Sequence, residues 1–135
     1  MREQTFIEER DEALYMAYIN ALRQPDVKSH QQAIVTAINS PTSRFWICPY
    51  RAYREILWCQ NGKRPSHISK TRNELVIDLY NKYNEIKDKP SFRGCSTFFI
   101  SQFAVASPTK CFYISYLTAS RIIHKKREER RRNAT

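Results

Sequence analysis

The segment Ser40–Leu57 returns 67 residues later as Ser107–His124, and this repetition constrains the fold more than any other feature of the chain. Eight of the 18 aligned positions are identical, where about one identity is expected by chance. We therefore predict an internal duplication within a single domain that covers residues 1–135 and shares one core. Its predicted parts are repeat one at about 5–60, a linker at 61–70, repeat two at about 71–124, and a basic C-terminal helical extension at 124–135.

Each repeat is predicted to open with an amphipathic helix. The patterns Thr5-x-x-Glu8 and Thr71-x-x-Glu74 are typical of capping boxes at helix starts. Apolar residues then recur at the spacing of one helical face. They are Leu14, Ala17, Tyr18 and Ala21 in the first repeat and Val76, Leu79, Tyr80 and Tyr83 in the second.

Two more helices are predicted in each repeat. Ser29 is expected to cap the second helix of repeat one, and its counterpart in repeat two is expected at about Thr97–Ala106. The apolar side of that counterpart is expected to consist of Ile100, Phe103 and Ala104. Cys48-Pro49 and Ser115-Tyr116 are typical of the N-cap and first position of a third helix.

A short strand is predicted between the second and third helices of each repeat. Phe45 and Ile47 alternate with more polar neighbours, and Phe112 and Ile114 do the same in the second copy. Because a lone strand leaves its backbone unpaired, we expect the two strands to form an antiparallel ribbon about a pseudo-two-fold axis. The alternative is that each strand pairs elsewhere or is an extended connector. The predicted class is mainly α with a minor β element.

The duplicated strand followed by a helix resembles the ribbon-helix-helix repressors, in which a strand pair enters the major groove of DNA. That resemblance implies a DNA-binding ribbon. This sequence departs from that family, because two predicted helices precede each strand and both copies lie in one chain.

The net charge of +10 favours polyanionic partners, with nucleic acid ahead of anionic surfaces. Residues 1–12 carry five acidic side chains and no apolar run, so we expect no signal segment and no membrane-spanning segment. A cytoplasmic location without membrane partners is the corresponding expectation.

The residues offer little for catalysis or cofactor binding. Gly62 and Gly94 are the only glycines, so a phosphate-cradling loop of the common kinds cannot be written. The four cysteines include no C-x-x-C pair, and the three histidines supply no closely spaced metal ligands. We expect no enzyme activity, no cofactor and no metal site.

Basic residues are the candidate binding groups. Arg54 and Arg121 occupy equivalent positions of the two third helices, where they suit either two phosphates or a structural carboxylate contact. The C-terminal run suits a phosphate backbone or, alternatively, a solvated helix end stabilised by Glu128 and Glu129. Trp46 and Tyr113 beside these cations are expected in the core, with base stacking as the alternative. The predicted nucleic-acid-binding residues are Arg44, Arg51, Arg54, Lys63, Arg64, Lys110, Arg121, Lys125, Lys126, Arg127, Arg130, Arg131 and Arg132.

The sequence thus leaves two functional hypotheses. The first is a small regulator or accessory protein that binds nucleic acid, DNA in preference to RNA. The second is an interaction or scaffold module that binds an acidic protein and no nucleic acid.

Overall fold

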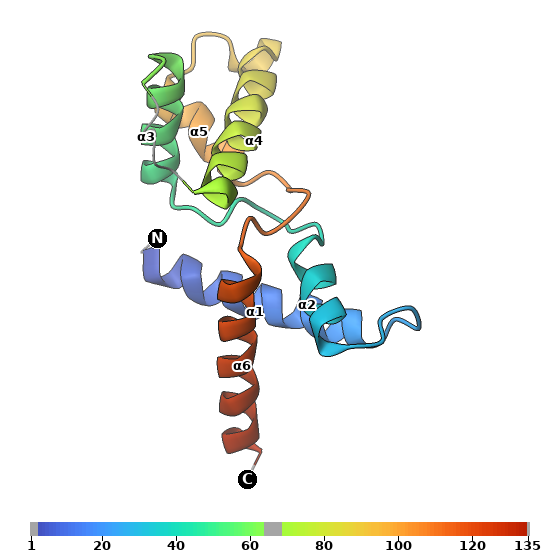
Figure 1. Cartoon of the computed structure of the whole chain (residues 1–135). Helices are drawn as coiled ribbons and strands as arrows, with labels where there is room; N and C mark the ends of the chain where they lie inside the picture. The colour runs from blue at the N-terminus through green and yellow to red at the C-terminus, as the bar shows by residue number, and fades with distance from the viewer. Residues whose placement is uncertain (1–2, 64–68, 135) are drawn as a thin grey trace.

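A computed structural model describes residues 3–63 and 69–134 of the chain, and these residues are mainly helical (Figure 1). The helices are α1 (Glu3–Leu22), α2 (His30–Ile38), α3 (Pro49–Gln60), α4 (Lys70–Lys87), α5 (Thr97–Val105) and α6 (Tyr116–Asn133), with a 3-10 turn, η1, at Pro90–Phe92. The described part of the chain contains no strand longer than a single bridge pair.

Serine hydroxyls begin four of the helices. Ser29, Ser69, Ser96 and Ser115 each accept a hydrogen bond from the backbone N–H three residues later. Such a bond satisfies one of the N–H groups that lack a partner in the first helical turn. The starts predicted at Ser29, Cys48-Pro49 and Ser115-Tyr116 are confirmed.

The two predicted capping boxes are wrong. Helix α1 is already formed at Glu3, upstream of Thr5, and helix α4 begins after Ser69, two residues before Thr71. In α4 the reason is local: the Ser69 hydroxyl accepts from the Arg72 N–H at 3.3 Å, so the helix has a cap before Thr71 is reached.

The helices form two three-helix units rather than one shared core. Helices α1 and α2 pack against each other and against α6, whereas α4 and α5 pack against each other and against α3 (Figure 1). The buried side chains separate accordingly into two clusters, one around Leu14 and Ile123 and one around Leu79 and Ile56. Each unit therefore completes its core with a third helix that comes from the other half of the chain.

Two extended segments cross each other between the units. Residues 39–48 connect α2 to α3, and residues 106–115 connect α5 to α6. Thr42 and Thr109 exchange two backbone hydrogen bonds, of 3.2 and 2.8 Å, in an antiparallel bridge. Beyond the bridge, the Phe45 N–H donates to the carbonyl of Val105 at 2.9 Å. The Phe112 N–H donates to the carbonyl of Ile38 at 3.0 Å. The 67-residue offset relates Thr42 to Thr109 and converts the Phe45–Val105 bond into the Phe112–Ile38 bond.

The predicted two-stranded ribbon is wrong, since pairing is limited to the bridge at Thr42 and Thr109. The alternation predicted for these segments is nevertheless present, because Phe45, Ile47, Phe112 and Ile114 are all buried. The first two lie in the cluster with α3, α4 and α5, and the other two lie in the cluster with α1, α2 and α6. Burial in separate clusters draws the segments apart, and carbonyl groups at helix ends take the N–H groups of Phe45 and Phe112. Without a ribbon, the implied resemblance to ribbon-helix-helix proteins has no structural counterpart here.

The two segments differ in backbone conformation at one equivalent position. Tyr113 has φ of 56°, in the left-handed region that side chains with a Cβ seldom occupy, whereas its counterpart Trp46 does not have positive φ. The Tyr113 hydroxyl donates to Asp78 at 2.6 Å, and its ring stacks on Phe45 with centroids 5.9 Å apart. These side-chain contacts hold Tyr113 in a strained backbone conformation.

Truncation of one core should destabilise one unit. We expect Ile123→Ala to cost about 2–5 kcal/mol of local stability, because Ile123 is fully buried in the cluster of α1, α2 and α6. Hydrogen exchange should accelerate mainly in those three helices. The matched variant Ile56→Ala should give the reverse pattern, in α3, α4 and α5. Equal acceleration in all six helices in both variants would show one continuous core.

Candidate nucleic-acid interface

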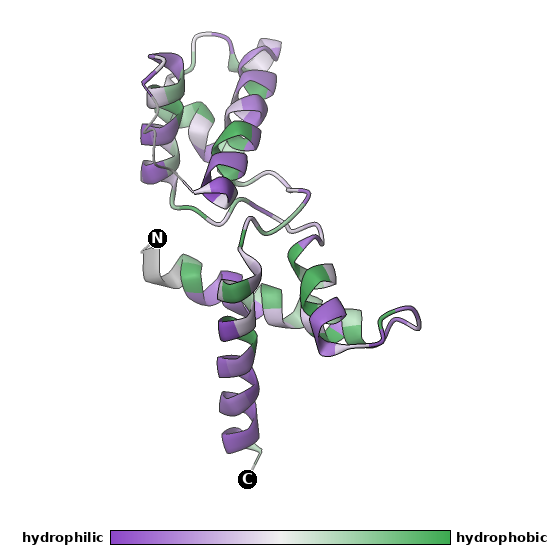
Figure 2. Ribbon diagram, viewed as in Figure 1, coloured by the Kyte–Doolittle hydropathy of each residue, from purple (hydrophilic) through white to green (hydrophobic). Residues whose placement is uncertain are grey.

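Helix α6 is anchored at its N-terminal half and extends away from the body at its C-terminal half. Ser115 caps its start, and Ala119 and Ile123 are buried against α1 and α2. Beyond Ile123 the helix continues to Asn133 and stands out from the rest of the molecule (Figure 1). Its C-terminal turns are hydrophilic (Figure 2). The C-terminal half of this 18-residue helix thus projects from the fold.

Cations on the inward side of α6 bind helix α1. The Lys126 ammonium lies 3.3 Å from one carboxylate oxygen of Glu12, and the Arg130 guanidinium donates to the other. Arg130 also covers the ring of Tyr15, 4.8 Å from its centroid. The predicted binding residues Lys126 and Arg130 therefore hold the projecting helix to the fold.

The outward side of α6 carries a second set of cations. At 100° per residue, Arg121, Lys125 and Arg132 lie on the side opposite Lys126 and Arg130. We call these three residues the outer stripe. It is about 16 Å long, from the 1.5 Å helical rise per residue. Arg121 and Lys125 are exposed and make no ion pair or hydrogen bond with the rest of the described chain.

Two more cations, Arg127 and Arg131, lie along one side of α6 between the inward cations and the outer stripe. Arg127 is exposed, and no ion pair joins it to a carboxylate of residues 3–63 or 69–134. Arg131 lies 3.4 Å from Glu128 in a pair one turn apart. Exposed pairs of this kind contribute about 0.5 kcal/mol or less and break readily. The outward side of α6 is therefore mainly basic, with the carboxylates of Glu128 and Glu129 beside the outer stripe.

The equivalent position on α3 is occupied differently. Arg54 is exposed like Arg121, but its guanidinium covers the ring of Trp58 at 5.4 Å from the centroid. Arg51 and Glu55 line a shallow hollow with these two residues. The two helices thus share the arginine, but Trp58 of α3 stands where α6 has Lys125.

The remaining predicted site residues are dispersed. Arg44 is half-buried, with its guanidinium 4.1 Å from the centroid of the Phe6 ring and 5.6 Å from that of Trp46. Burial lowers the pKa of Arg44 from its ordinary value, against an opposing effect of Glu9. Lys110 pairs with Asp78 at 3.3 Å. Lys63 is exposed just past the end of α3, and Arg64 lies outside the described residues.

Trp46 and Tyr113 support the core rather than a base-stacking surface. Both are partly buried, each packed against one of the two clusters. The Trp46 indole donates to the Thr42 hydroxyl at 2.9 Å. Burial, together with the hydrogen bond to Asp78, raises the pKa of the Tyr113 hydroxyl far above its ordinary value.

Sequence reasoning missed two features of these surfaces. Glu12 divides the basic residues of α6 into engaged and outward-facing groups, and the acidic run at residues 8–12 was the available signal. Phe103 was expected to face inward with Ile100 and Ala104, and this is wrong, because its side chain is 45% exposed. The reason is that Ile100, Ala104 and Val105 already fill the inner side of α5.

Other chemistry has little structural basis in the described residues. None of the four cysteines forms a disulfide. No group of three or more His, Cys, Asp or Glu side chains within residues 3–63 and 69–134 is arranged to hold a metal ion. The helices in those same ranges include none with the length and apolar character needed to cross a membrane.

Comparison with protein-family models, with curated proteins and with solved structures found no match to this chain.

The contact of Glu12 with α6 should be measurable as a coupling free energy. In a double-mutant cycle of Glu12→Gln and Arg130→Gln, we expect a coupling of about 0.2–1 kcal/mol at low salt, because both side chains are half-exposed. Thermal or urea unfolding measures it. Coupling should shrink toward zero in about 1 M NaCl. A cycle with no coupling at low salt would show that Glu12 does not hold α6.

Proposed function

We propose that this protein binds double-stranded nucleic acid, with DNA preferred over RNA, through the outward side of α6. The observation that carries the proposal is the division of charge on that helix. Lys126 and Arg130 are engaged by Glu12, while Arg121 and Lys125 face solvent on the opposite side. Exposed cations on one side of a projecting helix suit contact with a phosphate backbone.

The shape of α6 supports a groove contact. The major groove of B-form DNA is about 12 Å wide and admits an α-helix. The C-terminal half of α6 projects from the body (Figure 1), and with Lys126 and Arg130 held by α1 on the inward side, its outward side is the one that groove walls can approach. The major groove of A-form RNA is too deep and narrow for such a helix. This difference favours duplex DNA.

The contacts available are mainly to phosphates. Arg121, Lys125, Arg127, Arg131 and Arg132 outnumber the carboxylates and amide of this part of α6, which are those of Glu128, Glu129 and Asn133. Phosphate contacts position a protein but carry no sequence information. We therefore propose an accessory or architectural binder with low sequence specificity.

Arg54, Arg51 and Lys63 form a secondary basic surface in this proposal. They lie on or just after α3, which occupies in its unit the place that α6 occupies in the other. Two such surfaces would be related by the pseudo-two-fold arrangement that we propose for a duplicated chain. The internal duplication, with the repeat bounds predicted above in one domain, remains part of the proposal.

Duplex binding should fall when the outer stripe is neutralised. We expect Arg121→Gln/Lys125→Gln to weaken binding of a duplex of about 20 base pairs by about tenfold or more at low salt. The slope of log K against log salt should decrease by about two. Fluorescence anisotropy with labelled duplex DNA and duplex RNA measures both effects, and DNA should bind more tightly.

The matched control is Lys82→Gln/Lys110→Gln, which removes the same charge from two lysines that pair with Glu85 and Asp78. It should change affinity far less. Equal losses of duplex affinity in both variants would show that binding depends only on the net charge of the protein. Failure of the wild-type protein to retain duplex at low salt would overturn the proposal and favour the acidic-protein alternative.

A further inference from the structure

Helix α5 is apolar on both its inner and its outer side. Ile100, Ala104 and Val105 are buried against α3 and α4. On the outer side, Phe98, Phe99 and Phe103 are 40%, 44% and 45% exposed. Exposed phenylalanines in such density on one short helix are unfavourable in water and are typical of an interaction surface.

Neighbouring rings extend this surface in two directions. On the α3 side, Tyr53 meets Phe98 edge-on at 5.3 Å, and the exposed Tyr50 lies next to Tyr53. On the η1 side, Phe92 meets Phe103 at 5.0 Å. We call the whole set the aromatic surface: Tyr50, Tyr53, Phe92, Phe98, Phe99 and Phe103.

The equivalent helix of the other unit shows that the fold does not require these rings. Helix α2 has the same length as α5, begins after an equivalent serine cap, and packs in its unit as α5 does. At the 67-residue offset, Phe98, Phe99 and Phe103 correspond to polar residues. Those residues are Gln31, Gln32 and Thr36. A helix in this position therefore folds without aromatic side chains on its outer side, where Val35 is exposed among polar residues, so the fold does not require the phenylalanines of α5.

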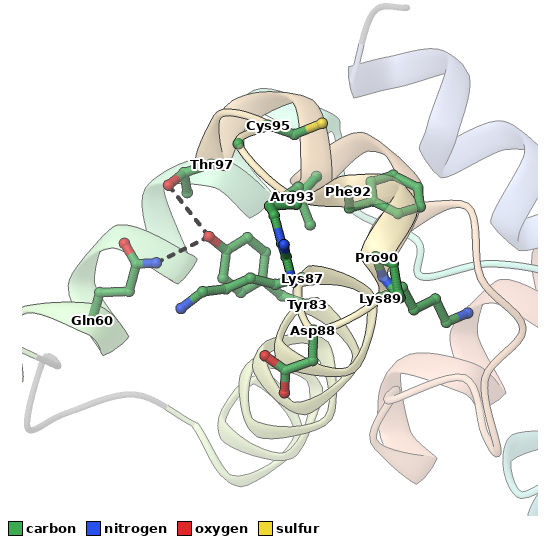
Figure 3. A pocket seen from close by; sticks show the side chains of 12 residues that line it. Gln60, Tyr83, Lys87, Asp88, Lys89, Pro90, Phe92, Arg93, Cys95 and Thr97 are labelled. Atoms are coloured by element: carbon green, nitrogen blue, oxygen red, sulfur yellow. Dashed lines mark hydrogen bonds between the residues drawn. The ribbon is translucent and has the colours of Figure 1, made fainter.

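The charges beside the aromatic surface indicate the partner's chemistry. Phe92 also lines an open hollow of about 420 Å³ whose lining includes Lys87, Lys89 and Arg93 (Figure 3). Asp88 is the one acidic residue among the side chains that line it. An acidic partner complements this rim.

The size of the surface favours a short element over a second copy of the chain. A buried aromatic side chain contributes about 150–250 Å², so the three phenylalanines at 40–45% exposure present roughly 250 Å² and Tyr50 at 62% adds roughly 120 Å². A stable dimer buries about 800 Å² on each partner. An amphipathic helix that inserts apolar residues from successive turns needs far less.

The ring geometry disfavours base stacking as the role of this surface. Phe92 and Phe103 lie at 76° to each other, and Phe99 and Phe103 lie at 56°. Edge-on packing of this kind directs ring edges at neighbouring faces, whereas stacked bases need open, parallel faces. The rings instead form an uneven apolar surface suited to branched aliphatic side chains.

We propose that the aromatic surface docks an acidic amphipathic helix of a partner protein, with its apolar side on Phe98, Phe99 and Phe103 and its carboxylates toward Lys87, Lys89 and Arg93. This function is separate from duplex binding by α6. It gives the protein one surface for nucleic acid and another for a protein partner.

The test uses the full chain and two labelled probe peptides of about 18 residues, one with leucines opposite glutamates and one with leucines opposite lysines. We expect saturable binding of the leucine–glutamate peptide and binding about tenfold weaker or less for the leucine–lysine peptide, measured by fluorescence anisotropy. Amide resonances of α5 should shift on addition of the first peptide. Equal binding of both peptides, or no binding of either, overturns the proposal.

A variant that copies α2 onto α5 tests the surface itself. Phe98→Gln/Phe99→Gln/Phe103→Thr should weaken peptide binding by about tenfold or more and leave duplex affinity unchanged, which also reports that the protein is folded. The matched control Ile7→Gln/Met16→Gln/Val35→Thr removes three exposed apolar side chains elsewhere and should bind the peptide normally. If the triple α5 variant does not fold, Phe99→Gln alone should still weaken binding.

Other occupants would give other results. Binding of anionic phospholipid vesicles or of a thymidine oligonucleotide that depends on these phenylalanines, without peptide binding, would overturn the proposal. Peptide binding that survives in the triple variant would do the same.

Discussion

The crossing of residues 39–48 and 106–115 is the constraint on which the rest of the structure depends. Four backbone hydrogen bonds, two between Thr42 and Thr109 and one each from Phe45 and Phe112, fix how the two segments pass each other. The crossing sends α3 to helices α4 and α5 and sends α6 to helices α1 and α2. Because three-helix units of this size bury little surface alone, each half depends on the other for a complete core.

Residues at equivalent positions of the two three-helix units can be compared with each other. Where equivalent positions agree, as with Ala52 and Ala119 or Ile56 and Ile123, the residues are buried and the fold accounts for them. Where the residue types differ, the same helix packing accommodates both of them, and the difference calls for another explanation. Both proposed surfaces include such differences: Lys125 of the outer stripe corresponds to Trp58 of α3, and the phenylalanines of α5 correspond to polar residues of α2.

Local signals in the sequence predicted much of the helical framework. Ser29, Ser115 and Pro49 begin helices as expected, because a capping hydroxyl or a fixed proline φ acts within one turn. The predictions at Thr5 and Thr71 were wrong by a few residues. Which unit each third helix joins could not be predicted, since Ala52 with Ile56 and Ala119 with Ile123 present nearly the same apolar face to either helix pair.

The candidate surfaces were predictable only in part. The basic run after Ile123 was evident from composition, but its division by Glu12 depends on a contact between residues more than 100 positions apart. The outer side of α5 had no clear signal, because large apolar residues fall on several sides of this helix and their spacing does not reveal which of them face solvent. Pairing and exposure of this kind follow from tertiary packing rather than from spacing.

Nuclear Overhauser contacts from the Ile56 and Ile123 methyl groups test the central claim of exchanged third helices most directly. The structure predicts that Ile56 contacts side chains of α4 and α5, including residues of the cluster with Leu79, and that Ile123 contacts side chains of α1 and α2, including residues of the cluster with Leu14. Contacts from Ile56 to Leu14 or Ala33, and from Ile123 to Leu79 or Ile100, would contradict the exchange and with it the account of both surfaces.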